Sequence, residues 1–134
     1  MFSDKEINYL KSQRLARIAT VSGNLQPDVA PVGLEFDGES FYIGGLQQTK
    51  TFKYENVAAG NSKVALAIDD WESIDPWKPR GIKIHGDAEI VERPGTQGPA
   101  PYLKVKPLRV WSWGIERKVF ENGKPVISRK AAGD

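Results

Sequence analysis

The chain has 134 residues, the size of one domain with a single hydrophobic core. It has no cysteine and one histidine, which excludes disulfides and thiolate metal sites and argues against a transition metal held by protein ligands. A net charge of +2, from 19 basic and 17 acidic residues, is too balanced for a dedicated nucleic-acid binder.

The beginning of the chain predicts a helix. Ser3 and Glu6 have the spacing of a capping box, which places a helix over residues 4–13. The acidic residues there do not suit a leader peptide, and no apolar run in the chain is long enough to cross a bilayer. We therefore expect a soluble cytoplasmic protein with neither a membrane nor a nucleic acid as its partner.

Short strands joined by turns are predicted to follow this helix. Pro27 and Pro31 interrupt the second strand, which predicts an edge strand or a bulge there. The predicted strands of this half cover residues 15–21, 26–36 and 40–44, with a hairpin turn at 37–38 before the third.

A second helix, predicted to end near residue 60, carries two lysines at its beginning. Either Thr49 or Thr51 can cap the first turn, so Lys50 and Lys53 would share one face beside unpaired backbone N–H groups. A positive charge at this end of a helix is unfavourable, whereas a bound phosphate would turn the cost into a gain. From these residues alone, a phosphate site and two solvated surface lysines remain equally open.

The second half of the chain is predicted to consist mainly of strands. In the first of them, over residues 63–69, Val64 and Leu66 face the core, while Ala65 and Ala67 leave a flat face that another body can approach. The remaining predictions are a loop at 70–80, a strand over 81–92 with Ile82, Ile84, Gly86, Ala88 and Ile90 toward the core, a loop at 93–101, a strand over 108–115 and a turn at 122–123. Short connections between consecutive strands predict a mostly β fold with flanking helices, an antiparallel six-stranded barrel forming a single domain over residues 1–134.

The sequence shows no machinery for hydrolysis or for general acid–base catalysis. His85 lies in a polar row between Lys83 and Asp87, which favours a solvated or ion-paired histidine over a catalytic one. No serine lies in a Gly-x-Ser-x-Gly turn. Any redox chemistry would therefore come from a cofactor.

Three glycines and one short segment are candidate ligand contacts. Gly44, Gly45 and Gly81 fall at strand ends, where they mark either room for a planar ligand or ordinary turns. The segment Trp77-Lys78-Pro79-Arg80 suits a polyanionic, partly aromatic ligand. In the alternative interpretation Trp77 packs down and Arg80 pairs with Asp69, Asp70 or Asp75.

Several segments, taken in chain order, resemble the pyridoxamine 5'-phosphate oxidase-like split barrels. They are LARIATV (15–21), VAPVG (29–33), FYIGG (41–45), TK (49–50) and RGIKIHG (80–86). The segments DPWKPRG (75–81) and PLRVWSWG (107–114) are similar to the actinobacterial branch that uses the deazaflavin coenzyme F420. The resemblance implies an FMN-binding type of split barrel and a homodimer with two cofactor clefts at the subunit interface, to which the Ala65/Ala67 face and Trp111 and Trp113 would contribute.

The resemblance also implies the cofactor-binding residues. The cofactor ring would lie along Ala30, Pro31, Val32, Gly33, Gly44 and Gly45, and the phosphate against Thr49, Lys50 and Lys53. The cofactor tail or the mouth of the cleft would meet Trp77, Lys78 and Arg80. Gly81 falls where the flavin oxidases of the superfamily place a side chain that touches the ring, and the C-terminal arginine motif of those oxidases is missing, so vitamin B6 oxidation is disfavoured.

The sequence thus predicts a reductase that transfers hydride from reduced F420 to an unsaturated small-molecule acceptor, with no catalytic side chain assigned. One alternative keeps the fold and makes the protein an FMN-binding oxidase or flavin reductase. Another is a non-catalytic carrier of F420, flavin or haem. An oligonucleotide-binding barrel would use Arg109 with Trp111 and Trp113.

Overall fold

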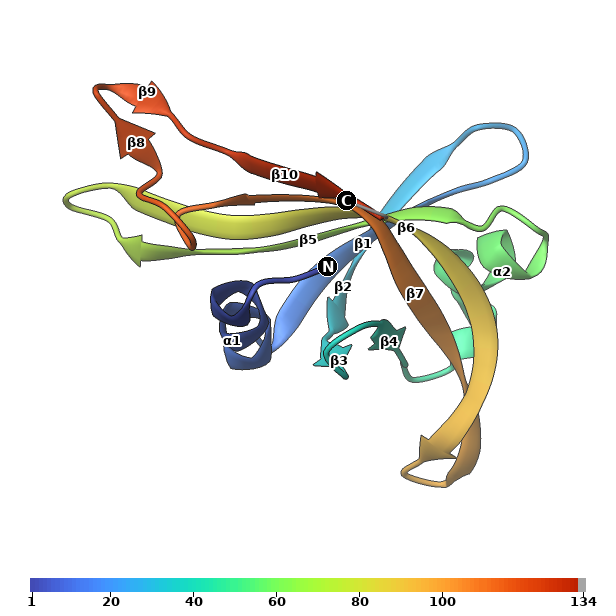
Figure 1. Cartoon of the computed structure of the whole chain (residues 1–134). Coiled ribbons are helices and arrows are strands. Elements are labelled where there is room, and N and C mark those ends of the chain that lie inside the picture. Colours follow the sequence, from blue (N-terminus) through green and yellow to red (C-terminus); the bar gives the residue numbers. More distant parts are fainter. Residues whose placement is uncertain (133–134) are drawn as a thin grey trace.

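The computed structural model describes residues 1–132 and is built mainly of antiparallel strands (Figure 1). The helices are α1 (Asp4–Ser12), the 3₁₀ turn η1 (Gln48–Lys50) and α2 (Phe52–Ala58). The strands are β1 (Leu15–Val21), β2 (Pro27–Gly33), β3 (Glu35–Phe36), β4 (Phe41–Ile43), β5 (Lys63–Ser73), β6 (Lys78–Gly95), β7 (Gly98–Trp113), β8 (Phe120–Glu121), β9 (Lys124–Pro125) and β10 (Ser128–Ala131). Neither α-helix of the described chain is long and apolar enough to cross a membrane.

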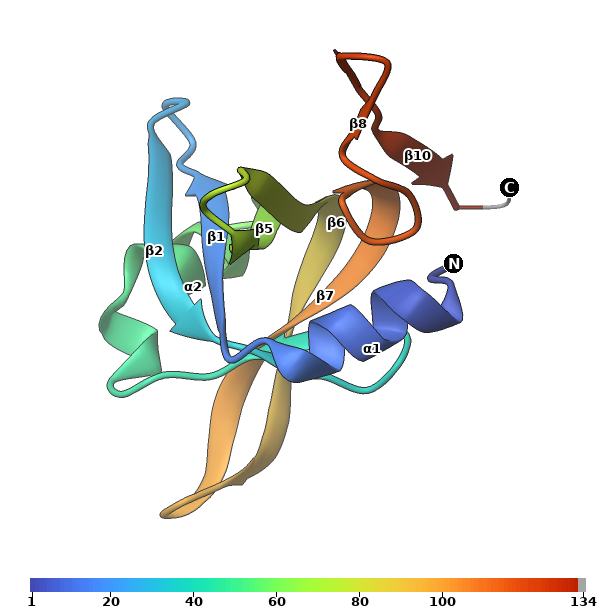
Figure 2. The same cartoon turned by 90° about the vertical axis from the view of Figure 1, so that its left-hand side faces the viewer.

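The main sheet has the strand order β2-β1-β5-β6-β7-β4-β3, with β10 also paired to β7. The long strands β6 and β7 curve strongly (Figure 2), and β4 and β3 continue the sheet beyond β7, so that the sheet closes in part and forms a split barrel. The barrel core contains Phe41, Leu66, Ile84, Leu103 and Val105, each with no more than 1% of its surface exposed. Helix α2 packs against β1, β2 and β6.

The start of α1 is the predicted capping box. The Ser3 hydroxyl accepts from the Glu6 N–H at 3.2 Å, and the Glu6 carboxylate accepts from the Ser3 N–H at 3.0 Å. The same carboxylate oxygen, Glu6 Oε1, also pairs with Lys130 of β10, so the C-terminal strand is tied to the first helix. The other oxygen, Oε2, is buried without a hydrogen-bond partner among the described residues. The edge position of β2 and the turn at Asn122-Gly123 are likewise confirmed.

The loops predicted at 70–80 and 93–101 are wrong. Both regions are ends of long hairpins, in which Asp70 pairs with Arg80 across β5 and β6 and Arg93 pairs with Ala100 across β6 and β7. The proline and glycine residues there predicted loops. The strands nevertheless extend through both regions, because contacts between facing strands, which the sequence pattern does not reveal, stabilise them. Asp70 and Arg80 form an ion pair, and the Arg93 guanidinium lies 3.9 Å from the ring centre of Tyr42.

One position of the predicted core is also wrong. Ile90 is 37% exposed, although the four other inward positions predicted on its strand are buried. Ile90 pairs with Leu103 at the last position where β4 still pairs with β7, so it lies at the border of the barrel core.

Candidate functional site

The segment between β4 and α2 differs from the predicted lysine-bearing helix. Thr51, not Thr49, is the N-cap of α2, and its hydroxyl accepts from the Tyr54 N–H at 3.3 Å. Lys50 therefore lies before the cap, in η1, where it is exposed. Lys53 lies in the first turn of α2 and is buried. The prediction that the two lysines share one helix face is wrong, because the helix begins between them.

Lys53 is the unusual charge of this segment. Its side chain belongs to a residue that is only 7% exposed, and no hydrogen bond or ion pair to it is found within residues 1–132. Burial lowers the pKa of the Lys53 ammonium, and the charge of Asp28 on β2 opposes this shift. A largely buried cation without a hydrogen-bonded counterion is costly, and Asp28 acts on Lys53 without forming an ion pair with it, so this position favours a bound anion.

Gln48 provides a second unpaired polar group beside Lys53. Its amide Nε2 donates to the Ile43 carbonyl at 2.8 Å, while its Oε1 is buried and has no partner in the described chain. A Cβ at Gly45 would lie 3.0 Å from this Oε1 and 3.7 Å from Lys53 Nζ. The missing side chain at Gly45 thus leaves both polar groups next to its backbone, and we call this set of three residues the Gln48/Lys53 recess.

Sequence reasoning found Lys53 and Gly45 but missed Gln48. A glutamine that precedes a helix is common on protein surfaces, and only its burial at 4% exposure distinguishes this one. The sequence carries no signal for that burial.

The strand predicted to lie along the cofactor ring is β2. Pro31 and Gly33 are exposed on this edge strand, Ala30 is half-buried, and Val32 points into the core at 7% exposure. Because α2 packs against β2, this strand and the Gln48/Lys53 recess belong to the same region of the molecule. The Val32 side chain faces away from it, so only its backbone is available there.

The remaining residues predicted to contact the cofactor lie far from the Gln48/Lys53 recess. Trp77, Lys78, Arg80 and Gly81 belong to the β5–β6 hairpin, which extends from the side of the barrel opposite α2 (Figure 1). The cofactor residues implied by the resemblance therefore form two groups that one protomer does not bring together.

The ion-pair interpretation of Arg80 is confirmed. Its Nε donates to Asp70 Oδ1 at 2.7 Å and its Nη2 to Oδ2 at 3.0 Å, and this pairing holds the pKa of Asp70 below its usual range. The guanidinium also lies 5.0 Å from the ring centre of Tyr9. Trp77, in contrast, does not pack down, since 56% of its surface is exposed.

Gly44 and Gly81 make room for aromatic rings of the chain itself. A Cβ at Gly44 would lie 2.6 Å from the Tyr102 ring, and a Cβ at Gly81 would lie 2.6 Å from Trp113 Cζ2. At Gly81 the Ile68 carbonyl oxygen, at 2.9 Å, closes the space from the other side. Intramolecular packing is thus sufficient to account for both glycines.

We expect Gly81→Ala to lower the free energy of unfolding by about 1–3 kcal/mol, the usual cost of overpacking a buried position. Chemical denaturation of the variant and of the unmodified protein measures this difference in the free energy of unfolding. Combining it with Trp113→Ala should recover only part of the loss, because the Ile68 carbonyl remains in place. Unchanged stability of the single variant would show that Gly81 is not required by packing.

The outward sheet face holds an apolar groove of about 490 Å³ whose walls include Ala65, His85 and Leu108. The His85 ring packs against Trp111, with ring centres 4.6 Å apart, and Leu108 is 38% exposed. The flat Ala65/Ala67 face predicted from the sequence therefore exists and is open in one protomer.

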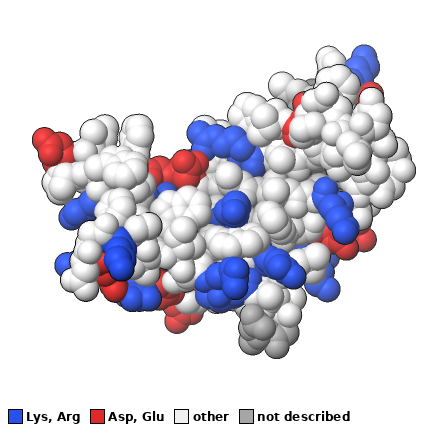
Figure 3. Space-filling model, turned by 90° about the horizontal axis from the view of Figure 1, so that it is seen from above, with Lys and Arg blue, Asp and Glu red and all other residues white. Residues whose placement is uncertain are grey.

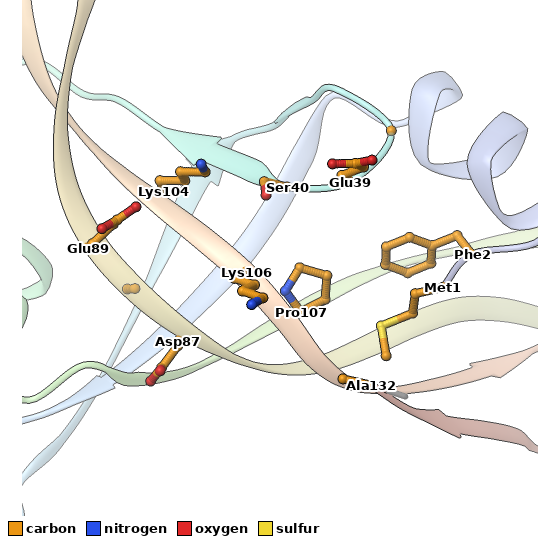
Figure 4. A pocket seen from close by; sticks show the side chains of 12 residues that line it. Met1, Phe2, Glu39, Ser40, Asp87, Glu89, Lys104, Lys106, Pro107 and Ala132 are labelled. Atoms are coloured by element: carbon orange, nitrogen blue, oxygen red, sulfur yellow. The ribbon is translucent and has the colours of Figure 1, made fainter. Parts of the chain in front are cut away.

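A larger groove, of about 670 Å³, lies beside the N-terminus (Figure 4). Met1 and Phe2 line one end of it, and charged side chains of β6 and β7 line the other. None of the predicted site residues lines this groove. Seen from above, the molecule shows basic groups interspersed with neutral and acidic ones (Figure 3).

Comparison with known proteins identifies the family. The family model described as pyridoxamine 5'-phosphate oxidase matches residues 3–113. A 5a,11a-dehydrotetracycline/5a,11a-dehydrooxytetracycline reductase of Streptomyces rimosus is 35% identical over 122 residues, which is 86% of this chain and 84% of the relative.

Two solved structures share the fold. An F420 reductase matches with a TM-score of 0.59 and 21% identity, over 77% of this chain and 94% of that chain. An FAD-binding protein of Mesorhizobium loti matches with a TM-score of 0.64 and 17% identity, over 83% of this chain and 93% of that one. These matches support the fold described above, and the family model and the reductase relative show that the chain belongs to the pyridoxamine 5'-phosphate oxidase family of split-barrel oxidoreductases.

Proposed function

We propose that the protein is a homodimeric reductase that uses reduced coenzyme F420 to reduce a conjugated, unsaturated organic acceptor. The observation that carries the proposal is the Gln48/Lys53 recess, where the largely buried residue Lys53 has no hydrogen bond or ion pair within the described chain and only the nearby charge of Asp28 acts on its ammonium group. A phosphate is the anion that this position favours, since it supplies both charge and hydrogen-bond acceptors.

The residues of the recess fit such a cofactor. Lys53 would hold the phosphate, with exposed Lys50 as a second cation nearby in the chain. Gly45 leaves the recess open, and the unpaired Gln48 Oε1 would accept a hydrogen bond from a cofactor donor. The edge strand β2 beside α2 would provide the backbone along which the ring lies.

A second copy of the chain would complete the site. Trp77 and Lys78 lie on the hairpin opposite the recess, so they can contribute to a cleft only if the hairpin belongs to the partner. The apolar groove at Ala65 and Leu108 offers a surface for that contact. A dimer formed there would bring together the two groups of predicted residues that one protomer keeps apart.

When bound, reduced F420 supplies a hydride. The chain's own residues bind and orient the cofactor and exclude water, and we assign the proton that completes the reduction to no side chain. The reductase relative is named for a dehydrotetracycline, a fused-ring molecule, which supports a conjugated fused-ring ketone as the class of acceptor.

The proposal is tested by mixing the protein anaerobically with reduced F420 and a panel of conjugated ketones, and by following reoxidation of the cofactor. We expect turnover with reduced F420 and none with reduced FMN at the same concentration. Turnover with reduced FMN alone would establish the flavin alternative. Binding of F420, flavin or haem without turnover of any acceptor would instead support a carrier.

A further inference from the structure

The C-terminal segment leaves β7 at a fixed point and crosses the start of β6. Gly114 follows the last residue of β7 and has a φ of +69°, which side chains disfavour. A Cβ at Gly114 would lie 2.4 Å from the Pro79 carbonyl oxygen. The chain therefore passes close over Pro79, directly beside the β5–β6 hairpin.

The segment then folds into the small hairpin formed by β8 and β9. The Val126 N–H donates to the Val119 carbonyl at 2.8 Å and closes the hairpin. Arg117 Nε and Nη2 donate to the Glu121 carboxylate at 3.2 and 2.7 Å, which ties β8 to the preceding turn. The position of Phe120 is thus defined by contacts on both sides of it.

Phe120 comes to lie against Trp77 of the β5–β6 hairpin. The two ring centres are 5.8 Å apart and the planes are inclined by 36°. The small hairpin and the β5–β6 hairpin extend from the same side of the barrel in Figure 1. Two segments that are about forty residues apart in sequence therefore present a pair of rings next to each other.

Both rings remain open to solvent. Trp77 is 56% exposed and Phe120 is 40% exposed, and Ile74 at the hairpin tip is 69% exposed. A contiguous exposed apolar surface on a folded protein is typical of a binding surface. The contacts described above therefore hold two solvent-exposed rings next to each other.

We propose that Trp77 and Phe120 form an aromatic platform that binds the acceptor and selects planar, fused-ring molecules. This inference rests on the proposed function, because it assigns the acceptor of that reaction to Trp77, which the proposed dimer would bring to the partner's recess, and to Phe120 beside it. The favourable free energy of stacking on an aromatic face increases with the flat conjugated area of the ligand. A fused-ring molecule therefore binds more tightly than a single ring.

The size of the platform favours a small molecule over a protein. Aromatic side chains bury about 150–250 Å² each, so the half-exposed pair offers roughly 200 Å². A stable protein interface buries about 800 Å² on each partner. A flat ligand of a few fused rings matches the available area.

Calorimetric titration of the full chain with anthraquinone-2-sulfonate, a soluble planar probe, tests the proposal without requiring turnover. We expect Trp77→Ala and Phe120→Ala each to raise the Kd for this probe about tenfold, the effect of removing one stacking ring. Trp77→Leu keeps an apolar side chain without the flat ring and should behave like Trp77→Ala. The Kd for F420 should stay unchanged in Phe120→Ala, because Phe120 is not among the residues assigned to the cofactor.

Trp71→Ala is the matched control, since Trp71 is 59% exposed on the neighbouring strand β5 but has no ring contact with Phe120. It should leave the Kd for the probe unchanged. An unchanged Kd in the Trp77 and Phe120 variants, an equal loss in Trp71→Ala, or no binding of the probe to the unmodified protein would overturn the proposal. So would dissociation of the dimer by either alanine variant, which would make the platform a contact between copies.

The same experiment separates this inference from the proposed function. If the probe binds with the expected dependence on Trp77 and Phe120 but reduced F420 supports no reduction, the platform stands and the reductase assignment fails. If reduction proceeds and the variants do not affect the Kd or the KM of a planar acceptor, the platform fails and the reductase assignment stands.

Discussion

Replacing Lys53 by glutamine is expected to weaken F420 binding by about 1.5–3 kcal/mol, the range for a hydrogen bond to a charged group. This corresponds to a rise in Kd of about 10- to 150-fold. The physical reason is that Lys53 is a largely buried residue of the Gln48/Lys53 recess and has no ion pair within residues 1–132. Isothermal calorimetry with F420 measures the effect directly.

The same substitution should not destabilise the fold. The pKa of Lys53 is lowered in the folded protein, so the charged form is disfavoured by folding, and removing the charge should raise the free energy of unfolding. The unmodified protein should therefore have a lower free energy of unfolding than Lys53→Gln. This difference should shrink as the pH rises toward about 10.4, because Lys53 loses its proton at a lower pH in the folded state than in the unfolded state. A binding loss combined with a stability gain is the signature of a ligand-binding residue.

Two other lysines provide controls. Lys11→Gln removes an exposed charge on α1, far from the recess, and should leave the Kd for F420 unchanged. Lys50→Gln should weaken binding less than Lys53→Gln, because Lys50 is exposed and its charge is better screened by water. Equal Kd values for Lys53→Gln and the unmodified protein would remove Lys53 from the cofactor site.

Replacing Lys130 by methionine is expected to lower the free energy of unfolding by about 3 kcal/mol at neutral pH, the lower end of the range for breaking a buried ion pair. Glu6 is fully buried, whereas 31% of the Lys130 side chain is exposed. The variant leaves a buried carboxylate without its cation. Urea denaturation of both proteins gives the difference.

The effect should depend on pH in a defined direction. Burial alone would raise the pKa of Glu6, but hydrogen bonds from Lys130 and from the Ser3 N–H lower it overall. A lowered pKa contributes stability that is present above about pH 4.3 and is lost as the pH falls through the folded-state value. The difference between the two proteins should therefore shrink in acid. Lys124→Met, on the exposed strand β9, should have no such effect, and a constant difference across the pH range would rule out Glu6 as its origin.

The sequence predicted those features that depend on local pattern. The capping box at Ser3 and Glu6, the edge strand interrupted by Pro27 and Pro31, and the alternation of β5 are set by neighbouring residues, so they could be recognised without a structure. The lengths of β6 and β7 could not be predicted, because contacts such as that of Arg93 with the Tyr102 ring join residues whose proximity depends on the hairpin itself.

The candidate site was predictable to a similar extent. Lys53 and Gly45 were singled out by their places at a helix start and a strand end, and the resemblance assigned them to the cofactor. The burial of Gln48 and the separation of Lys53 from Lys50 depend on where the helix cap falls. Either Thr49 or Thr51 could cap in the sequence, and only the fold selects Thr51. The contact of Trp77 with Phe120 links two hairpins, and no local pattern indicates it.

The proposed function depends on the Gln48/Lys53 recess, which we infer holds the phosphate of F420 in a dimeric reductase. The most direct test is parallel calorimetric titration of the unmodified protein and of Lys53→Gln with F420 and with FMN. The account predicts one F420 bound per protomer, tighter binding of F420 than of FMN, and loss of F420 affinity in the variant. No heat with F420, or F420 affinity that is the same in both proteins, would contradict it.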